Sequence, residues 1–131
     1  MSFLLDTSVC VGAIRRLPEV EQRLRLYDPS EVAVSVVTVL ELLFGAAISR
    51  APELNRQQVE LFLAGISILD FKRDIAVGAV SARVLMRRAG LGVSDFDLLI
   101  AATAIVHGRV LMTSDRNFLR IPGLMVEDWT T

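Results

Sequence analysis

The sequence has very few residues of the kinds that crosslink a chain or bind soft metal ions. Cys10 is the only cysteine and His107 the only histidine among 131 residues. These counts exclude a disulfide framework and a zinc site built from several cysteines. A lone cysteine suits a reducing compartment, so we expect a cytoplasmic protein in which Cys10 is a small buried hydrophobic residue.

An excess of charge of one sign is also absent. The chain carries 14 basic and 15 acidic residues, which gives a formal net charge of −1. This balance excludes a uniformly basic protein that coats nucleic acid, although it leaves room for a local basic patch. Every basic residue except Lys72 is an arginine, which suits phosphate contacts but is equally explained by genomic base composition.

Uninterrupted apolar runs that could cross a membrane or direct export are missing as well. The 18 residues from Val32 to Ser49 include Glu41 near their centre, and a central carboxylate costs a few kcal/mol in lipid. The opening apolar run has no basic flank and ends at Asp6. We therefore expect no membrane contact, no signal peptide and a single domain over residues 1–131. The hydrophobic content of 53% leaves apolar surface for a partner.

Short apolar runs separated by helical stretches predict an α/β fold with a parallel sheet. The predicted strands are residues 3–5, 32–36, 66–69, 110–113 and, at the edge, 124–126. Capping and proline signals predict the helices between them. Helices are expected near Ser8, from Pro18, through Glu41 to before Pro52, from about Asn55, from Asp74 to about Ala89, and from Ser94 to Gly108.

Acidic residues follow several of the predicted strands. Asp6 comes directly after the first strand, Glu41 lies in the helix after the second, and Asp115 follows the fourth. Ligands of open parallel sheets bind outside the carboxyl ends of the strands. Asp97 reaches the same edge if its helix, which begins at Ser94, runs antiparallel to the strands. The sequence therefore predicts four carboxylates near one edge of the sheet.

Four neighbouring carboxylates need either shared protons or a cation. Two unit charges about 4 Å apart repel by roughly 4 kcal/mol at an effective dielectric constant near 20. Carboxylate oxygens without histidine or cysteine suit Mg²⁺ or Mn²⁺. These ions polarise phosphoryl oxygens and activate water, so the pattern points towards phosphodiester hydrolysis. Metal-independent ribonuclease chemistry would need paired histidines or a histidine–glutamate pair, and this chain has only His107.

Five segments carry a family resemblance that extends over essentially the whole chain. They are residues 5–9 (LDTSV), 39–42 (VLEL), 94–104 (SDFDLLIAATA), 111–118 (LMTSDRNF) and 121–124 (IPGL). In order and spacing these segments resemble the PIN domains, and more narrowly the VapC-type toxins of prokaryotic toxin–antitoxin pairs. The resemblance implies a three-layer α/β/α sandwich with a mostly parallel central sheet of four to five strands.

The same resemblance implies an activity and a set of site residues. The implied activity is that of a Mg²⁺- or Mn²⁺-dependent endoribonuclease that cleaves tRNA, rRNA or mRNA, leaves a 5′-phosphate and a 3′-hydroxyl, and inhibits translation and growth. The acids matching the family's catalytic and metal-binding positions are Asp6, Glu41, Asp97 and Asp115. Hydroxyl positions beside the site match Thr7, Ser8 and Thr113, where they can orient carboxylates or water.

Partners are also implied. VapC-type toxins are usually dimers held inactive by a cognate antitoxin, whose hydrophobic helix would lie in a groove with a basic side chain reaching the acids. The arginines near the predicted strand ends are candidates for RNA contacts, or equally solvated surface residues. They are Arg15, Arg16, Arg116 and Arg120.

Simpler roles stand beside these interpretations. Asp6 and Asp97 could be helix caps, and Glu41 could be a solvated helix residue. His107 suits the negative end of a helix dipole, and Trp129 is expected to pack the C-terminal tail. The acids expected at exposed, loop or cap positions are Asp70, Asp74, Asp95 and Asp128.

Two other enzyme-like classes fit the residues less well. A haloacid-dehalogenase-type phosphatase would need a second aspartate two residues after the first, where Ser8 stands. A receiver domain would be phosphorylated near Asp70 and would carry a late lysine, whereas the only lysine is Lys72. The non-enzymatic alternative is a PIN-like module that binds or helps to process RNA without a toxin role. It predicts RNA binding that does not depend on Asp97.

Overall fold

The computed structural model describes residues 1–129, and its elements alternate between strands and helices. In chain order they are β1 (Phe3–Leu5), α1 (Thr7–Ile14), α2 (Pro18–Leu24), η1 (Pro29–Glu31), β2 (Val32–Ser35), α3 (Val36–Ala47), α4 (Pro52–Ala64), β3 (Ser67–Leu69), α5 (Arg73–Arg88), α6 (Asp95–Val106), β4 (Val110–Met112), η2 (Arg116–Arg120) and β5 (Val126–Glu127).

The five strands form one sheet in the order β3-β2-β1-β4-β5, and every pairing between them is parallel. The predicted "mostly parallel" sheet is thus parallel throughout the described residues. Strand β1 is central: Phe3 pairs with Val32 on one side and with Val110 on the other. The carboxyl ends of β1, β2 and β4 therefore lie next to one another at one edge of the sheet.

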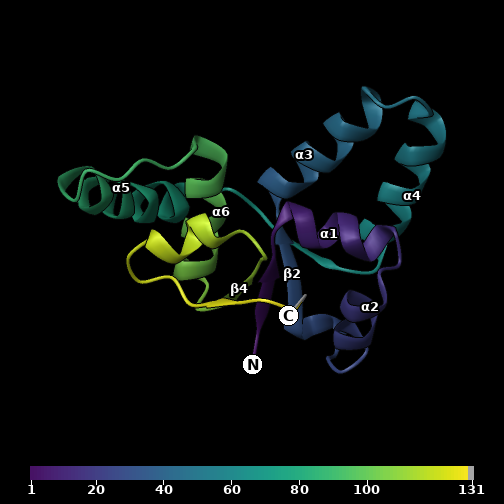
Figure 1. Cartoon of the computed structure of the whole chain (residues 1–131), viewed down its shortest axis with the longest axis horizontal. Helices are drawn as coiled ribbons and strands as arrows, with labels where there is room; N and C mark the ends of the chain where they lie inside the picture. Colours follow the sequence, from purple (N-terminus) through teal and green to yellow (C-terminus); the bar gives the residue numbers. More distant parts are fainter. Residues whose placement is uncertain (130–131) are drawn as a thin grey trace.

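Helices cover both faces of the sheet, which confirms the predicted three layers. Figure 1 shows α5 and α6 on one side of the strands and α1 to α4 on the other. Alternate side chains of β1 supply the two cores because successive residues of a strand point to opposite faces. Leu4 packs with residues of α5 and α6, whereas Phe3 and Leu5 pack with residues of α1 to α4.

Several element boundaries differ from the sequence predictions; strands β3 and β4, for example, are each one residue shorter than predicted. The second strand ends at Ser35 and not at Val36, because the Ser35 side chain caps α3 by accepting a hydrogen bond from the Thr38 amide. Helix α4 begins at Pro52 and not near Asn55, since proline fits the first turn of a helix. The last strand is shifted to Val126–Glu127.

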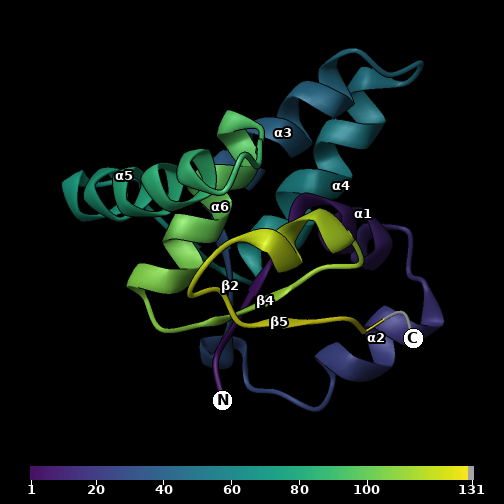
Figure 2. The same cartoon turned by 60° about the vertical axis from the view of Figure 1, so that its left-hand side comes forward.

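The end of the described chain returns to the sheet. The Trp129 ring stacks on Tyr27 with ring centroids 5.8 Å apart and meets Phe3 edge-on at 5.5 Å. This confirms the predicted packing role of Trp129. Figure 2 shows β5 running beside β4, and the residues after β5 lead towards α2, where Arg23 lies 3.9 Å from Glu127. Among the described residues, no helix has the length and apolar character needed to span a membrane.

Candidate active site

A cavity of about 400 Å³ lies at the carboxyl ends of the central strands, and all four predicted acids line it. Asp6 follows β1, Glu41 comes from α3, Asp97 from the first turn of α6, and Asp115 follows β4. Asp97 lies there because α6 begins at the same edge of the sheet. The predicted hydroxyl residues Thr7 and Ser8 also line the cavity.

Asp6 is the most deeply buried of these acids, with 4% of its surface exposed. It caps α1 by accepting a hydrogen bond from the Val9 amide at 2.9 Å. The Ser8 hydroxyl donates to both carboxylate oxygens, at 2.9 and 3.1 Å, and the Thr113 hydroxyl also donates to the Asp6 carboxylate. Ser8 and Thr113, both predicted as supporting residues, therefore fix the orientation of this carboxylate.

Burial raises the pKa of Asp6 above its ordinary value. Desolvation is the largest cause, the three hydrogen bonds oppose it, and the charge of Asp115 adds to it. Desolvation also raises the pKa of Asp97, and Asp115 again adds to the effect. Two carboxylates of the cavity are thus held in surroundings that penalise their ionised forms, with Asp115 as their common neighbour.

Glu41 is held by a hydroxyl chain of which the sequence analysis named Thr7 but not Thr38. The Thr7 hydroxyl donates to Glu41 Oε1 at 2.6 Å, and the Thr7 and Thr38 hydroxyl oxygens lie 3.2 Å apart. Thr38 is fully buried. Its position three residues before Glu41, on the same face of α3, was the available signal.

Asp97 lies in the first turn of α6, whose N-cap is Ser94, and Asp115 is the N-cap of η2. The Ser94 hydroxyl accepts a hydrogen bond from the Asp97 amide at 3.2 Å, as predicted. Asp115 accepts from the Asn117 amide at 2.9 Å, and its own amide donates to the Thr113 hydroxyl at 3.0 Å. Thr113 therefore connects Asp6 to Asp115.

The donor set fits a hard divalent cation. The cavity offers carboxylate and hydroxyl oxygens and no histidine or cysteine, and two of its carboxylates have raised pKa values that a cation would lower. Within residues 1–129, no three acidic, histidine or cysteine side chains are grouped closely enough to form a ligand set by themselves. Mg²⁺ in proteins commonly uses one or two carboxylates and retains several water molecules.

None of the predicted RNA-contacting arginines lines the acidic cavity, as far as residues 1–129 are concerned. Arg15 lines a second cavity beside it, and Arg116 lines a third that shares Ser114 and Asp115 with the acidic cavity. The Arg120 guanidinium donates hydrogen bonds to the Gly92 carbonyl and to the Asn117 side chain. Arg16 has a positive φ of 58° at the end of the turn after α1.

Several residues given simpler roles behave as predicted. Cys10 is buried, and His107 is the C-cap of α6. Asp95 is exposed on α6 and forms an ion pair with Arg83. Asp74 lies in the first turn of α5 and accepts a hydrogen bond from the Ile75 amide. None of these residues takes part in the acidic cavity.

Comparisons with known proteins agree with this geometry. The sequence profile of the PIN domain matches residues 3–124. A tRNA(fMet)-specific endonuclease VapC of Salmonella typhimurium is 37% identical, with 98% of each chain covered.

Solved structures give the same relationship. The crystal structure of DNA-bound VapBC from Salmonella typhimurium contains a chain that superposes with a TM-score of 0.93 at 35% identity, covering 98% of each chain. A toxin–antitoxin complex from Klebsiella pneumoniae superposes with a TM-score of 0.72 at 28% identity, covering 95% of this chain and 96% of that one. The chain therefore belongs to the PIN domain family and, within it, to the VapC-type toxins.

Proposed function

We propose that this protein, a single PIN domain, is a divalent-metal-dependent endoribonuclease and the toxin of a toxin–antitoxin pair. The observation that carries the proposal is the cavity in which Asp6, Glu41, Asp97 and Asp115 meet at the carboxyl ends of the parallel strands. The full-length similarity to a VapC endonuclease supports RNA as the substrate, with tRNA, rRNA and mRNA as the candidate classes. Cleavage of these RNAs would inhibit translation and growth.

Asp6, Asp97 and Asp115 would hold one or two Mg²⁺ or Mn²⁺ ions, directly or through water molecules of the ion, with Glu41 as a further ligand or a base. When bound, the ion supplies Lewis-acid polarisation of the phosphate and a more acidic water. The Ser8 and Thr113 hydroxyls keep the Asp6 carboxylate in place, so little reorganisation is needed during the reaction.

Glu41 is positioned to take the proton of the attacking water. The Thr7 hydroxyl occupies one lone pair of Oε1 and leaves the rest of the carboxylate facing the cavity. The water oxygen forms a bond to phosphorus, the bond from phosphorus to the 3′-oxygen breaks, and a proton goes to the leaving oxygen. The products are a 5′-phosphate and a 3′-hydroxyl.

Exposed apolar side chains support an antitoxin and a second copy of the chain as partners. Along α3, residues Leu40, Phe44 and Ile48 repeat every four positions and are 52%, 62% and 69% exposed. Val77 and Val80 of α5 are 60% and 61% exposed. Contiguous apolar surface of this kind marks interaction sites. An antitoxin that also placed a basic side chain near the four acids would block the site.

The test is a map of new 5′-phosphate RNA ends produced by the purified protein with Mg²⁺. Asp97→Asn is expected to lower cleavage by at least about a hundredfold. Asp95→Asn is the matched control, because Asp95 lies in the same first turn but is exposed and paired with Arg83. It is expected to cut like the wild type.

Chelation gives the second arm of this test. Removing divalent ions should abolish the new ends, and adding Mg²⁺ should raise the melting temperature of the wild type more than that of Asp97→Asn. Equal cleavage by the wild type and Asp97→Asn would show that the site is misplaced. RNA binding without cleavage by either protein would favour the RNA-binding module.

A further inference from the structure

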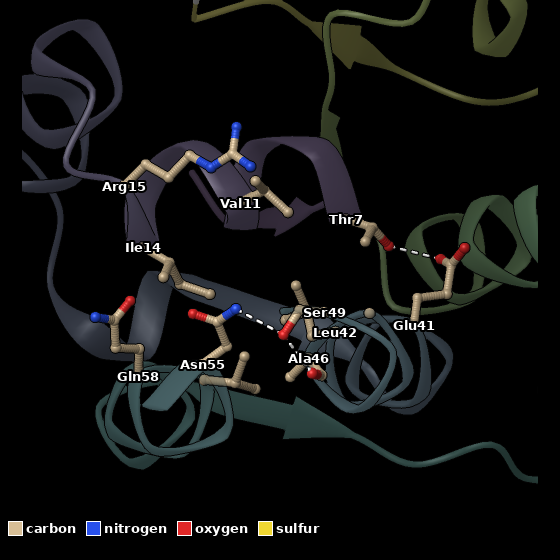
Figure 3. Close-up of a pocket in the computed structure, with 12 residues that line it drawn as sticks. Thr7, Val11, Ile14, Arg15, Glu41, Leu42, Ala46, Ser49, Asn55 and Gln58 are labelled. Atoms are coloured by element: carbon tan, nitrogen blue, oxygen red, sulfur yellow. Dashed lines mark hydrogen bonds between the residues drawn. The ribbon is translucent and has the colours of Figure 1, made fainter. Parts of the chain in front are cut away.

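A second cavity, of about 300 Å³, adjoins the acidic cavity and shares Thr7 and Glu41 with it. Figure 3 shows it between α1, α3 and α4, with Thr7 and Glu41 at one end and Asn55 and Gln58 at the other. Its walls include apolar side chains such as Val11, Ile14 and Leu42. The second cavity is therefore the immediate neighbour of the acidic cavity.

One polar group in this cavity has a fixed orientation. The Ser49 hydroxyl donates its only proton to the Ala46 carbonyl at 2.7 Å, so its oxygen must accept from Asn55, whose Nδ2 lies 2.8 Å away. This arrangement settles which way the Asn55 amide points. Its Oδ1 faces away from Ser49, as Figure 3 shows, and remains available as an acceptor.

A cation lies at the rim of the same cavity. Arg15 is exposed, lines the cavity and forms no ion pair with any residue from 1 to 129. It can contact a phosphate next to a group bound inside. The cavity thus combines apolar walls, one oriented acceptor and one cation. It lies next to the candidate site for phosphodiester cleavage.

We propose that this cavity binds one unpaired nucleobase of an RNA strand, adjacent to the scissile phosphate, and that Asn55 Oδ1 accepts a hydrogen bond from its exocyclic amino group. The inference rests on the proposed ribonuclease function. Sequence-specific RNA recognition typically takes a splayed base between side chains and reads its edge by hydrogen bonds. A volume at the lower end of ligand cavities suits a single base better than a long segment of protein.

The oriented acceptor predicts which bases are favoured. Cytosine and uracil have nearly the same size but differ at one edge, where cytosine carries an amino donor and uracil a carbonyl acceptor. Asn55 Oδ1 would accept from the amino group and repel the carbonyl. We expect cytosine to be preferred over uracil by about tenfold, which is the effect of one partly exposed hydrogen bond.

The experiment compares binding of decamers of cytidine and of uridine to the cleavage-deficient Asp97→Asn protein by fluorescence anisotropy. Asn55→Leu in that background should reduce the preference for cytosine to within about twofold. Ser49→Ala should do the same, because the Asn55 amide is then free to turn over and present its donor. Gln57→Leu is the matched control, since Gln57 is an exposed amide on α4 outside the cavity. It should keep the wild-type preference.

Each result separates this inference from the proposed function. Equal binding of the two decamers, or a preference that survives Asn55→Leu, would overturn the inference. An Asn55→Leu protein with unchanged RNA selectivity but weakened antitoxin binding would assign the cavity to the antitoxin and also overturn it. A wild-type protein that cuts RNA without preferring cytosine would leave the nuclease proposal intact. Selective binding without cleavage would support the inference and refute the nuclease.

Discussion

Asp6 combines a structural and a chemical role in the same carboxylate. One oxygen caps α1 through the Val9 amide, and the hydroxyls of Ser8 and Thr113 hold both oxygens towards the cavity. A capping residue is fixed by the start of its helix, so the side chain loses little further freedom when it binds a ligand. The capping interpretation and the catalytic interpretation of this residue are therefore compatible.

Thr38 offers a test of positioning at the scale of one residue. When Glu41 is ionised, the single proton of the Thr7 hydroxyl goes to Glu41, so Thr38 must donate to Thr7. Thr38→Val keeps the shape but removes that donor. We expect kcat for RNA cleavage to fall by about tenfold with little change in KM, and Thr38→Ser to restore it.

The control for Thr38 is another buried threonine in a helix. Thr103 of α6 is also buried, and its hydroxyl donates to the Leu99 carbonyl at 2.7 Å, away from the acids. Thr103→Val should leave kcat unchanged. If Thr38→Val and Thr103→Val behave alike, Thr38 has only a packing role.

At the scale of elements, the packing of α5 against α6 decides where Asp97 lies. Gly78 of α5 lies so close to α6 that a Cβ atom built on it would come within 2.8 Å of Val106 Cγ2. This close approach brings α5 and α6 together at the C-terminal end of α6. Helix α6 then begins at the carboxyl edge of the strands, which places Asp97 beside Asp115.

Gly78→Ala should therefore destabilise the protein although alanine favours a helix. Gly45 of α3 is the matched control, because nothing lies within 4 Å of its added Cβ. Gly45→Ala should raise the free energy of unfolding by about 0.5–1 kcal/mol. Gly78→Ala should lower it by about 1 kcal/mol, since the steric overlap exceeds the helix preference. Urea denaturation measures both, and a stabilising Gly78→Ala would contradict the tight contact.

At the scale of the whole molecule, the fold concentrates burial and like charge at its functional edge. The pKa of Asp6 is higher in the folded chain than its ordinary value of 3.8, with desolvation as the largest cause. The folded state therefore binds this proton more tightly than the unfolded state does. The contribution of Asp6 to stability rises as the pH falls through its folded pKa, and the ionised carboxylate destabilises the metal-free protein at neutral pH.

Asp6→Asn should therefore stabilise the metal-free protein while abolishing cleavage. Asparagine keeps the helix cap and removes the buried charge. With divalent ions chelated at pH 7, we expect a gain of about 1 kcal/mol, or roughly 3–5 °C in melting temperature. The gain should shrink as the pH is lowered towards 3.8. A melting temperature below that of the wild type at pH 7 would show that the carboxylate stabilises the fold.

Local patterns account for what the sequence predicted well. The short apolar runs predicted the strands, and the predicted N-cap at Ser94 was confirmed. Asp6 and Asp115 follow β1 and β4, and Glu41 lies in the helix after β2. These features depend on hydrogen bonds and side-chain periodicity within a few residues. Boundaries were less accurate at Val36 and Pro52, where a cap or a proline overrides the intrinsic preference of the neighbouring residues.

The sequence by itself determined the alternation of strands and helices, the α/β class and the order of the four acids. Only the tertiary structure decided that Asp97 joins the other three, that Thr38 supports Glu41 through Thr7, and that a second cavity containing Asn55 adjoins the site. The physical reason is the range of the interactions. Periodicity and capping act along a few residues, whereas these contacts depend on how whole helices pack on the sheet.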